Sequence, residues 1–252
     1  MTSEAPEIAA VVLTHNEAAR IDACLATLRW ADRMVVLDSA SEDGTAEAAR
    51  AAGAEVINRA FGDFAEQRNH ALAVVETDWI LFVDADEQIS PELAAETRQR
   101  AGREECVAYA IPRCNRILGG WLRATGWYPD HQTRLLRRDS CRYTTDRPVH
   151  EVVEADGPVG TLQSEMRHAG ADSIAEFRAQ QRRYAGLAAE GLCRRGIRAE
   201  IHSPFVQALR EFWRRMVELR GYRDGWRGLV LSVLMVEHEF RVYSQLRSGR
   251  RR

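Results

Sequence analysis

The sequence lacks the features that mark secreted, disulfide-bonded or zinc-stabilised proteins. Its five cysteines are scattered and include no Cys-x-x-Cys pair, which argues against a disulfide framework and against a structural zinc site. Residues 1–10 contain Glu4 and Glu7 and no basic segment, so we expect no signal peptide and a cytoplasmic protein.

Long apolar runs are also missing. The longest run in the C-terminal part extends from Leu229 to Val236, is interrupted by Ser232, and is far shorter than the roughly 20 residues that a membrane-spanning helix needs. The hydrophobic content of 45% in 252 residues is ordinary for a globular protein. The length therefore fits one large domain, or one domain with a helical extension.

Lysine is absent, so all 35 basic residues are arginines. The charges are unevenly distributed. Residues 1–177 contain 18 Arg and 30 Asp or Glu, a net charge of −12, whereas residues 178–252 contain 17 Arg and 7 acids, a net charge of +10. The basic C-terminal part indicates an anionic partner, either a membrane surface or nucleic acid.

Strands and helices alternate over the first hundred residues. Apolar runs rich in β-branched residues predict strands at residues 7–13, 34–37, 54–58 and 79–83, and the segments between them have the apolar spacing of helices. Asp43 is a predicted helix N-cap, and Ser90-Pro91-Glu92 predicts another helix start. Alternation with nearly all-apolar strands predicts a parallel sheet that is covered by helices on both faces.

Polar loops follow three of these strands, with the sequences THNE, DSASEDG and DADE. Because ligands of open α/β sheets bind beyond the carboxyl ends of the strands, we expect the three loops to share one rim. Asp84, Asp86 and Glu87 would repel one another unless a positive charge lay between them. A D-x-D pair can bind a hard divalent cation. Alternatively, DADE is a solvated turn before the next helix.

The pattern changes after residue 105. Shorter strands are predicted at 106–112, 133–138 and 149–153, which favours mixed or antiparallel additions to the sheet. The loop GGWLRATGWYPD separates the first two. Helical patterns follow at 172–194, 204–221 and 226–246.

This series of motifs resembles the family 2 glycosyltransferases of the GT-A fold. The resemblance rests on THNE, DSASEDGT, QRNHAL and the D-x-D after the fourth strand. The later segments GWYPDHQTRLLRR, DRPVHE and GYRDGWRG are similar to those of bacterial lipopolysaccharide-core β-glucosyltransferases. The resemblance covers nearly the whole chain. It implies an α/β fold with a mixed sheet flanked by helices in a catalytic domain of residues 1–171, and a helical, Arg-rich extension of residues 172–252.

The resemblance also implies a nucleotide-diphosphate sugar as donor, with a UDP-sugar expected, and Mg²⁺ or Mn²⁺ as cofactor. The implied donor-binding residues are Thr14, Asn16, Glu17, Asp38, Ser39, Arg68 and Asp84. The implied metal ligands are Asp86, Asp84 and His168. Each assignment has an alternative: Arg68 could pair with Asp63 or Glu66 one turn earlier, and His168 could be a plain loop histidine. His15, in place of an aromatic residue, either contacts the ligand or lies neutral on the sheet.

Inverting glycosyl transfer requires a base that deprotonates the attacking hydroxyl group. The resemblance favours Glu151 in this role, with Asp130 as the rival and His150 either orienting the carboxylate or acting itself. Alternatively, Glu151 pairs with Arg147 on a strand surface. Trp121, Trp127 and Tyr128 are expected to stack on a sugar or to pack in the interior.

The implied acceptor is a lipopolysaccharide core or another lipid-linked glycan, and glucose is the implied sugar. The C-terminal helices combine aromatic residues with arginines, so they could lie in a membrane interface or pack on the main domain. The resemblance favours peripheral attachment at the inner membrane. Nucleic acid is not expected, because no recognition motif accompanies the arginines. The competing hypotheses are a nucleotidyltransferase, which would usually have a Gly-rich loop where THNEAAR has none, and a non-catalytic scaffold.

Overall fold

The computed structural model describes residues 5–103, 105–144, 152–200 and 202–248. These residues form two compact units. One comprises residues 1–113 and 131–168, and the other comprises residues 114–130 and 169–252. The domain boundary expected between residues 171 and 172 stays a prediction.

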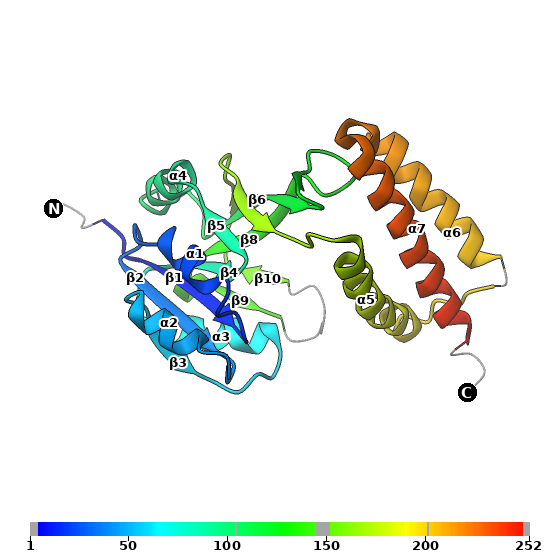
Figure 1. Ribbon diagram of the computed structural model, residues 1–252. Helices are drawn as coiled ribbons and strands as arrows, with labels where there is room; N and C mark the ends of the chain where they lie inside the picture. The colour runs from blue at the N-terminus through cyan, green and yellow to red at the C-terminus, as the bar shows by residue number, and fades with distance from the viewer. Residues whose placement is uncertain (1–4, 104, 145–151, 201, 249–252) are drawn as a thin grey trace. The chain divides into compact units, whose positions relative to one another are not determined.

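The first unit is built on a mixed β-sheet (Figure 1). Its strands are β1 (Ile8–Thr14), β2 (Arg33–Asp38), β3 (Glu55–Asn58), β4 (Trp79–Asp84), β5 (Glu87–Ile89), β6 (Ala108–Ile117), β8 (Asp130–Arg137), β11 (Val159–Thr161) and β12 (Met166–Ala169). They follow the order β3-β2-β1-β4-β8-β6-β12-β5, with β11 beside β6. Neighbours among β1 to β4 are parallel, whereas β8 is antiparallel to β4 and β12 to β5. Both the parallel start and the mixed additions predicted from the sequence are confirmed.

Side chains on both faces of this sheet are buried. Along β1, Ile8, Ala10 and Val12 belong to one apolar cluster and Ala9 and Val11 to another, as expected when successive residues point to opposite faces. Helices α1 (Ile21–Ala26), α2 (Thr45–Ala51) and α4 (Pro91–Ala101) supply residues to the first cluster, and α3 (Phe64–Val74) supplies residues to the second. The sheet is therefore covered on both sides, which is why its central strands are almost entirely apolar.

Two of the local predictions differ from the structure. The N-cap of α2 is Gly44, with a φ of 87°, and not Asp43, because the chain needs a left-handed residue there. The Asp43 carboxylate instead accepts from the backbone N–H groups of Ala18 and Thr45. Strand β6 extends to Ile117, beyond the predicted end at residue 112, because its last two residues pair antiparallel with β7 (Gly120–Trp121). The predicted N-cap Ser90 is confirmed by its bond from the N–H of Leu93.

A two-stranded sheet of β9 (Cys141–Tyr143) and β10 (Val153–Ala155) completes the first unit, with a 3₁₀ turn, Arg138–Ser140, before it. The strand predicted at 149–153 lies mostly outside the described residues.

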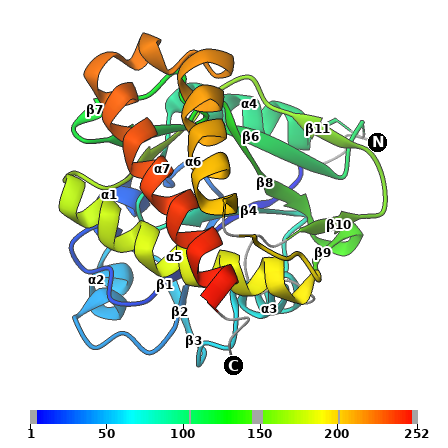
Figure 2. The same cartoon turned by 90° about the vertical axis from the view of Figure 1, so that its right-hand side faces the viewer.

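The second unit contains three long helices. They are α5 (Ile174–Arg194), α6 (Ser203–Trp213) and α7 (Gly225–Ser248). A π-helical turn, Arg214–Glu218, and a 3₁₀ turn, Gly221–Asp224, connect α6 to α7. Helix α7 packs against both α5 and α6 (Figure 2). Within the described part of the chain, no helix is both long and apolar enough to cross a membrane.

The turn before α7 holds the loop that follows β7 (Gly120–Trp121). The Asp224 carboxylate accepts from the N–H of Arg123 at 2.8 Å, the N–H of Ala124 at 3.1 Å and the hydroxyl of Thr125 at 2.6 Å. Buried Arg215 donates to the carbonyl of Thr125 at 2.6 Å and lies over the Trp127 ring. The C-terminal helices therefore fix the conformation of residues 123–127.

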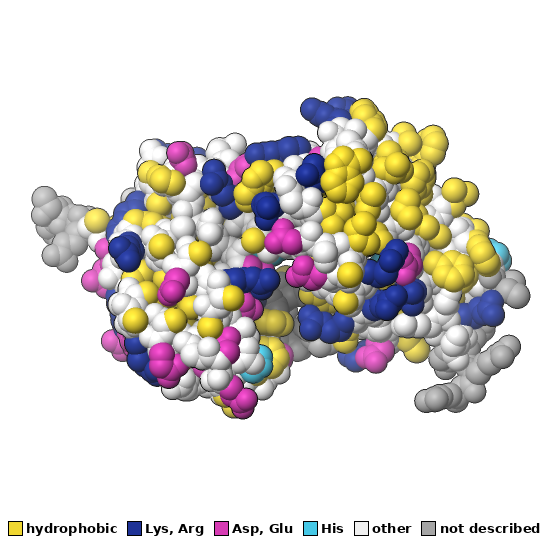
Figure 3. Space-filling model, in the orientation of Figure 1, with side chains coloured by type: hydrophobic (Ala, Val, Ile, Leu, Met, Phe, Trp, Pro, Cys, Tyr) yellow, Lys and Arg dark blue, Asp and Glu magenta, His cyan; other side chains and the backbone are white. Residues whose placement is uncertain are grey.

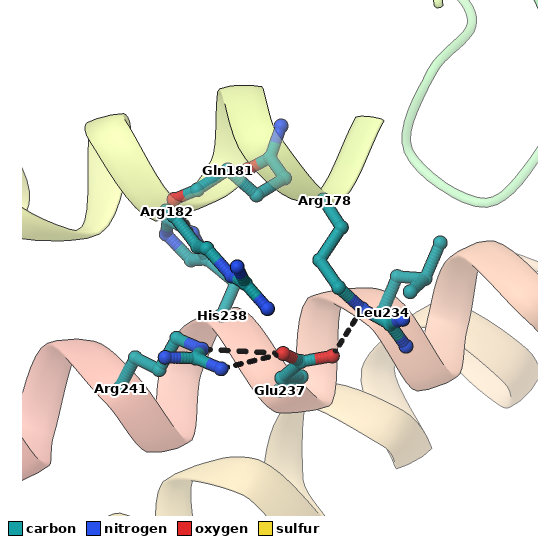
Figure 4. A pocket seen from close by; sticks show the side chains of 7 residues that line it. All are labelled: Arg178, Gln181, Arg182, Leu234, Glu237, His238 and Arg241. Atoms are coloured by element: carbon teal, nitrogen blue, oxygen red, sulfur yellow. Dashed lines mark hydrogen bonds and ion pairs between the residues drawn. The ribbon is translucent and has the colours of Figure 1, made fainter. Parts of the chain in front are cut away.

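The contact between α5 and α7 is polar at its outer edge (Figure 4). Glu237 on α7 bonds to Arg178 on α5 and to Arg241 one turn along α7. His238, which is 8% exposed, contacts the carbonyl of Gln181 through Nδ1 at 3.2 Å. Burial lowers the pKa of His238 below its ordinary value of 6.5.

Replacing Asp224 with Ala should cost about 3 kcal/mol of unfolding free energy, because three donors lose a charged acceptor. Urea denaturation followed by tryptophan fluorescence would measure the loss. Glu190→Ala is the control, since Glu190 is in an exposed pair with Arg194 and should cost under about 0.5 kcal/mol. Equal costs for the two variants would contradict the role of Asp224.

The stability of the helical unit should fall as the pH drops below 6.5. In the unfolded chain His238 binds a proton around its ordinary pKa of 6.5, whereas the buried imidazole binds one only at lower pH, so acid favours unfolding. The charge of Arg215 also lowers the pKa of His238, whereas the bond to the Gln181 carbonyl and the charge of Glu211 raise it. Between about pH 5 and 7.5, the denaturation midpoint should change less with pH in His238→Gln than in the unaltered protein. An identical slope would show that another group titrates.

Candidate active site

The ends of three parallel strands place the predicted polar loops along one edge of the sheet. In the strand register Thr14 lies opposite Asp38, and Leu13 lies opposite Asp84. The residues that follow β1, β2 and β4 therefore emerge side by side, and the shared rim predicted from the sequence is confirmed.

Asp38 is fixed by the chain itself. It is 1% exposed, and its Oδ1 accepts from the hydroxyls of Thr14 at 2.8 Å and Ser41 at 2.5 Å. Its Oδ2 accepts from the N–H of Ser41 at 2.9 Å. One acceptor position on Oδ2 remains for a further donor.

The THNE loop is interlocked with the DSASEDG loop. Asn16 has a φ of 57°, its N–H donates to the Ser41 hydroxyl and its amide oxygen accepts from the N–H of Glu42. The N–H of Glu17 donates to the Thr45 hydroxyl at 2.8 Å. Asn16 therefore connects the two loops, and its left-handed backbone conformation is one that asparagine adopts more readily than most residues.

His15 and Ser39 lie next to each other at this edge. The His15 Nδ1 atom is 2.8 Å from the carbonyl oxygen of Ser39, so Nδ1 carries the proton and Nε2 accepts from the side-chain nitrogen of Asn16 at 3.3 Å. Buried Gln67 on α3 lies 3.4 Å from the Ser39 hydroxyl and also donates to the carbonyl of Ala60. The side-chain oxygen of Gln67 has no hydrogen-bond partner among the described residues.

The end of β4 carries a network of buried ion pairs. Asp84 accepts from Arg134 at 2.5 Å and from Arg68 at 3.3 Å. Fully buried Glu87 accepts from Arg113 at 3.2 Å and from the N–H of Asp84 at 2.9 Å. Arginines of the chain therefore pair with two of the three acids in the DADE segment.

Electrostatics at this network follow from burial and proximity. Burial alone would raise the pKa of Asp84, but Arg134, then Arg68 and Arg113, hold it at about 2. Burial, followed by repulsion from Asp84, raises the pKa of Glu87. The pKa of Arg134 is raised, because the attraction of Asp84 and Glu87 outweighs its burial. Asp84 is thus a carboxylate at any physiological pH.

Arg68 pairs with neither Asp63 nor Glu66, the partners considered from the sequence. It is 4% exposed and lies against the rings of Tyr143, Phe64 and Phe82, with its guanidinium carbon 5.3 to 6.0 Å from their centroids. This aromatic cage directs the guanidinium toward Asp84.

Asp86 and His168 lie together beside this network. Strand β12 pairs antiparallel with β5 and places His168 opposite Glu87, next to Asp86 in the chain. His168 Nε2 is 3.3 Å from Asp86 Oδ2, and their side chains are 19% and 29% exposed. Burial raises the pKa of Glu17, and the charge of Asp86 is among the other causes, so Glu17 also lies near Asp86.

This donor set is small. No group of three or more His, Cys, Asp or Glu side chains in the described part of the chain is arranged to hold a metal ion. A carboxylate oxygen and an imidazole nitrogen at accessible positions nevertheless fit a divalent ion that takes its other ligands from water and substrate phosphates, as Mg²⁺ commonly does. Asp86 and His168 could therefore hold such an ion, while Asp84 is engaged by two arginines.

The predicted catalytic residues are not tested by this arrangement. Glu151 and His150 lie outside the described residues. Asp130 belongs to the second compact unit, where its Oδ2 is 3.4 Å from the side-chain nitrogen of Asn115. Trp121 is 46% exposed, whereas Trp127 stacks edge-on against buried Phe177, so the two tryptophans have different environments.

Three residues of the site were missed from the sequence: Arg113, Arg134 and Gln67. Arg134 precedes the buried pair Leu135-Leu136, and its apolar surroundings in the sequence resemble those of any strand arginine. Only the antiparallel pairing of β8 with β4 brings it to Asp84. Nothing in one sequence specifies that pairing.

Open α/β sheets with polar loops at the carboxyl ends of their strands commonly bind ligands there. Residues 9–150, more than half of the chain, match the sequence profile of glycosyl transferase family 2. The chain belongs to this family and is a glycosyltransferase with the GT-A fold. The predicted family, fold and enzyme class are thereby confirmed, and sugar transfer is favoured over nucleotidyl transfer.

The relatives differ in how much of each chain is shared. An uncharacterized glycosyltransferase of Rickettsia bellii is 25% identical over 96% of this chain and 86% of that protein. The lipopolysaccharide core biosynthesis glycosyltransferase LpsC of Rhizobium meliloti is 25% identical over 90% of this chain and 89% of its own. A TPR repeat-containing protein of Synechococcus elongatus is 30% identical over 59% of this chain, but the match spans only 36% of that protein.

Among solved structures, glucosyl-3-phosphoglycerate synthase from Mycobacterium tuberculosis has a TM-score of 0.49 and 19% identity, covering 76% of this chain and 81% of that chain. A likeness this distant says nothing about the substrates of this chain.

Replacing Arg134 with Met should cost about 3–5 kcal/mol of unfolding free energy, because Asp84 and Glu87 would lose a buried cation. Adding Glu87→Gln should recover part of that loss, and the double-mutant cycle would measure the coupling. Arg138→Met is the control, since the ion pair of Arg138 among the described residues is with its exposed neighbour Asp139. A cost for Arg134→Met as small as that of the control would contradict the network.

Proposed function

We propose that the chain transfers glucose from UDP-glucose, with inversion, to a lipopolysaccharide-core or other lipid-linked glycan. The observation that carries the proposal is the pairing of Asp86 with His168 at the edge where β1, β2 and β4 end. The similarity to LpsC, whose name refers to lipopolysaccharide core biosynthesis, supports the choice of acceptor.

The nucleoside would lie against the loops after β1 and β2. The acceptor position left on Asp38 Oδ2 suits a base N–H or a ribose hydroxyl. Thr14 would act by holding Asp38, and Asn16 by holding the loop that carries Ser39. Glu17 would border the site on the side of Asp86.

Asp84 and Arg68 would act as one element. Asp84 is ionised and its side chain is 32% exposed, so it can accept hydrogen bonds from ribose hydroxyls. Arg68 is too enclosed by aromatic rings to reach far beyond Asp84, so we propose that it positions this carboxylate rather than binding phosphate alone.

Asp86 and His168 would hold Mg²⁺ or Mn²⁺ together with oxygens of the donor diphosphate. Such an ion, when bound, would screen the diphosphate charge and stabilise the leaving nucleotide. Asp84 would then bind the nucleoside, whereas Asp86 would act at the diphosphate.

The transfer itself requires a base on the acceptor side. We propose that the carboxylate of Glu151, with Asp130 as the rival, takes the proton of the acceptor hydroxyl, and that His150 orients it. The hydroxyl oxygen forms a bond to the anomeric carbon from the face opposite UDP, the bond from that carbon to the diphosphate oxygen breaks, and UDP leaves with the electron pair.

A lipid-linked acceptor would bring the enzyme to a membrane. We propose peripheral attachment at the cytoplasmic face of the inner membrane through the Arg-rich C-terminal helices. No nucleic acid is proposed as a partner.

Thermal denaturation with UDP-glucose tests the donor site. The midpoint should rise with UDP-glucose and Mn²⁺ together, because a ligand at about 100 times its Kd adds about 2.7 kcal/mol of stability. Asp86→Asn should abolish the dependence on Mn²⁺. Asp139→Asn, which changes a carboxylate that is 81% exposed, should keep it. A response to nucleoside triphosphates alone, or an unchanged Mn²⁺ effect in Asp86→Asn, would overturn the proposal.

A further inference from the structure

Helix α6 and the turn after it expose a continuous apolar stripe. Phe205, Val206, Leu209, Trp213 and Val217 are 67%, 51%, 72%, 59% and 47% exposed. Val206, Leu209, Trp213 and Val217 recur at intervals of three and four residues, and Phe205 lies four residues before Leu209, so the five lie on one side of the helix. The opposite side is buried and polar, since Glu211 bonds there to Arg215.

A second stripe runs along α7 and the turn before it. Tyr222, Trp226, Leu229, Val233 and Phe240 are 61%, 56%, 48%, 51% and 38% exposed. The rings of Phe205 and Phe240 meet edge-to-face at 5.2 Å, which joins the start of the first stripe to the end of the second.

The two stripes form one surface, which we name the α6–α7 apolar face. It consists of the ten residues just given. Apolar side chains gather densely over α6 and α7 in Figure 3. Soluble proteins seldom expose apolar residues in such number side by side, so a face of this kind indicates a binding surface.

Arginines border the face. Arg210 on α6 and Arg220 and Arg223 in the turn are exposed, and none of the three has an ion-pair partner within the part of the chain that the structure describes. Arg227 lies over the Trp226 ring at 4.7 Å and donates to the carbonyl of Leu118, which holds this tryptophan in place. The face therefore combines fixed aromatic groups with unpaired positive charge.

We propose that the α6–α7 apolar face lies in the interfacial layer of a bilayer that contains anionic lipids, with the bordering arginines on the lipid phosphates. Tryptophan and tyrosine favour the headgroup level, and arginines close to the surface are attracted to anionic lipids. This proposal names the surface through which the membrane attachment proposed above would occur. It rests on the proposed function for the membrane location, and it does not depend on the sugar-transfer reaction.

Two other occupants fit less well. A second copy of the chain, docked through the same face about a twofold axis, would bring the two sets of bordering arginines to one interface, where their charges would repel one another. Insertion across the bilayer is not supported, because no described helix is apolar enough over the needed length. Binding parallel to the membrane surface satisfies both the apolar and the charged parts of the face.

Sedimentation with vesicles tests this assignment. The whole chain should bind vesicles of phosphatidylcholine with about 30% phosphatidylglycerol, bind pure phosphatidylcholine at least about tenfold more weakly, and lose affinity as salt rises. Trp213→Ser combined with Trp226→Ser should reduce binding at least about tenfold, because both rings leave the interface. The triple variant Arg210→Gln, Arg220→Gln and Arg223→Gln should lose most of the preference for the anionic lipid.

The matched control is Val74→Ser with Val159→Ser, which removes two apolar side chains that are 41% and 52% exposed in the first unit. It should bind vesicles like the unaltered protein. All variants should keep the helical circular dichroism, since the replaced side chains are exposed, and should keep the midpoint shift with UDP-glucose and Mn²⁺.

The proposal is overturned if the tryptophan variant binds as well as the control. It is also overturned if the unaltered chain does not bind vesicles. This holds whether the chain sediments as a monomer or as a dimer that the tryptophan variant disrupts. Loss of the UDP-glucose shift with intact vesicle binding would instead count against the sugar-transfer proposal alone.

Discussion

The architecture of the site depends on the ion pairs at the carboxyl end of β4. Asp84 and Glu87 are only three residues apart, and they can share that position because Arg134 from β8, Arg113 from β6 and Arg68 from α3 converge on them. A buried network of this kind adds little net stability, but removing one member leaves a charge without compensation. It joins three distant segments around one strand end, so it holds the DADE segment in a single conformation and leaves Asp86 beside His168.

The parts of the site that follow from local rules could be predicted. Parallel strands with apolar cores end at one edge, so the shared rim of THNE, DSASEDG and DADE followed from the strand pattern alone. The proximity of Asp86 to His168 depends on the pairing of β12 with β5, and only the family resemblance pointed to it. Arg134 and Arg113 could not be foreseen, because their partners are set by the pairing of strands far apart in sequence.

The helical unit shows a second limit of pattern analysis. In the sequence, the apolar residues at spacings of three and four are Phe205, Leu209, Phe212, Trp213, Met216 and Leu219. The π-helical turn at Arg214–Glu218 changes the rotation per residue, so that Val217 is exposed and Met216 is half-buried. The wider turn also allows buried Arg215 to reach both Glu211 and the carbonyl of Thr125. A search for a regular helical period in the sequence cannot predict a turn that contains an extra residue.

The bonds from Asp224 and Arg215 to residues 123–125 have a consequence for how the C-terminal part evolved. A C-terminal segment that only bound a membrane could be replaced or lost during evolution without affecting the rest of the enzyme. Here the same few residues that connect α6 to α7 also shape the segment leading to Asp130, so a relative that lost these helices would need a new support for that segment.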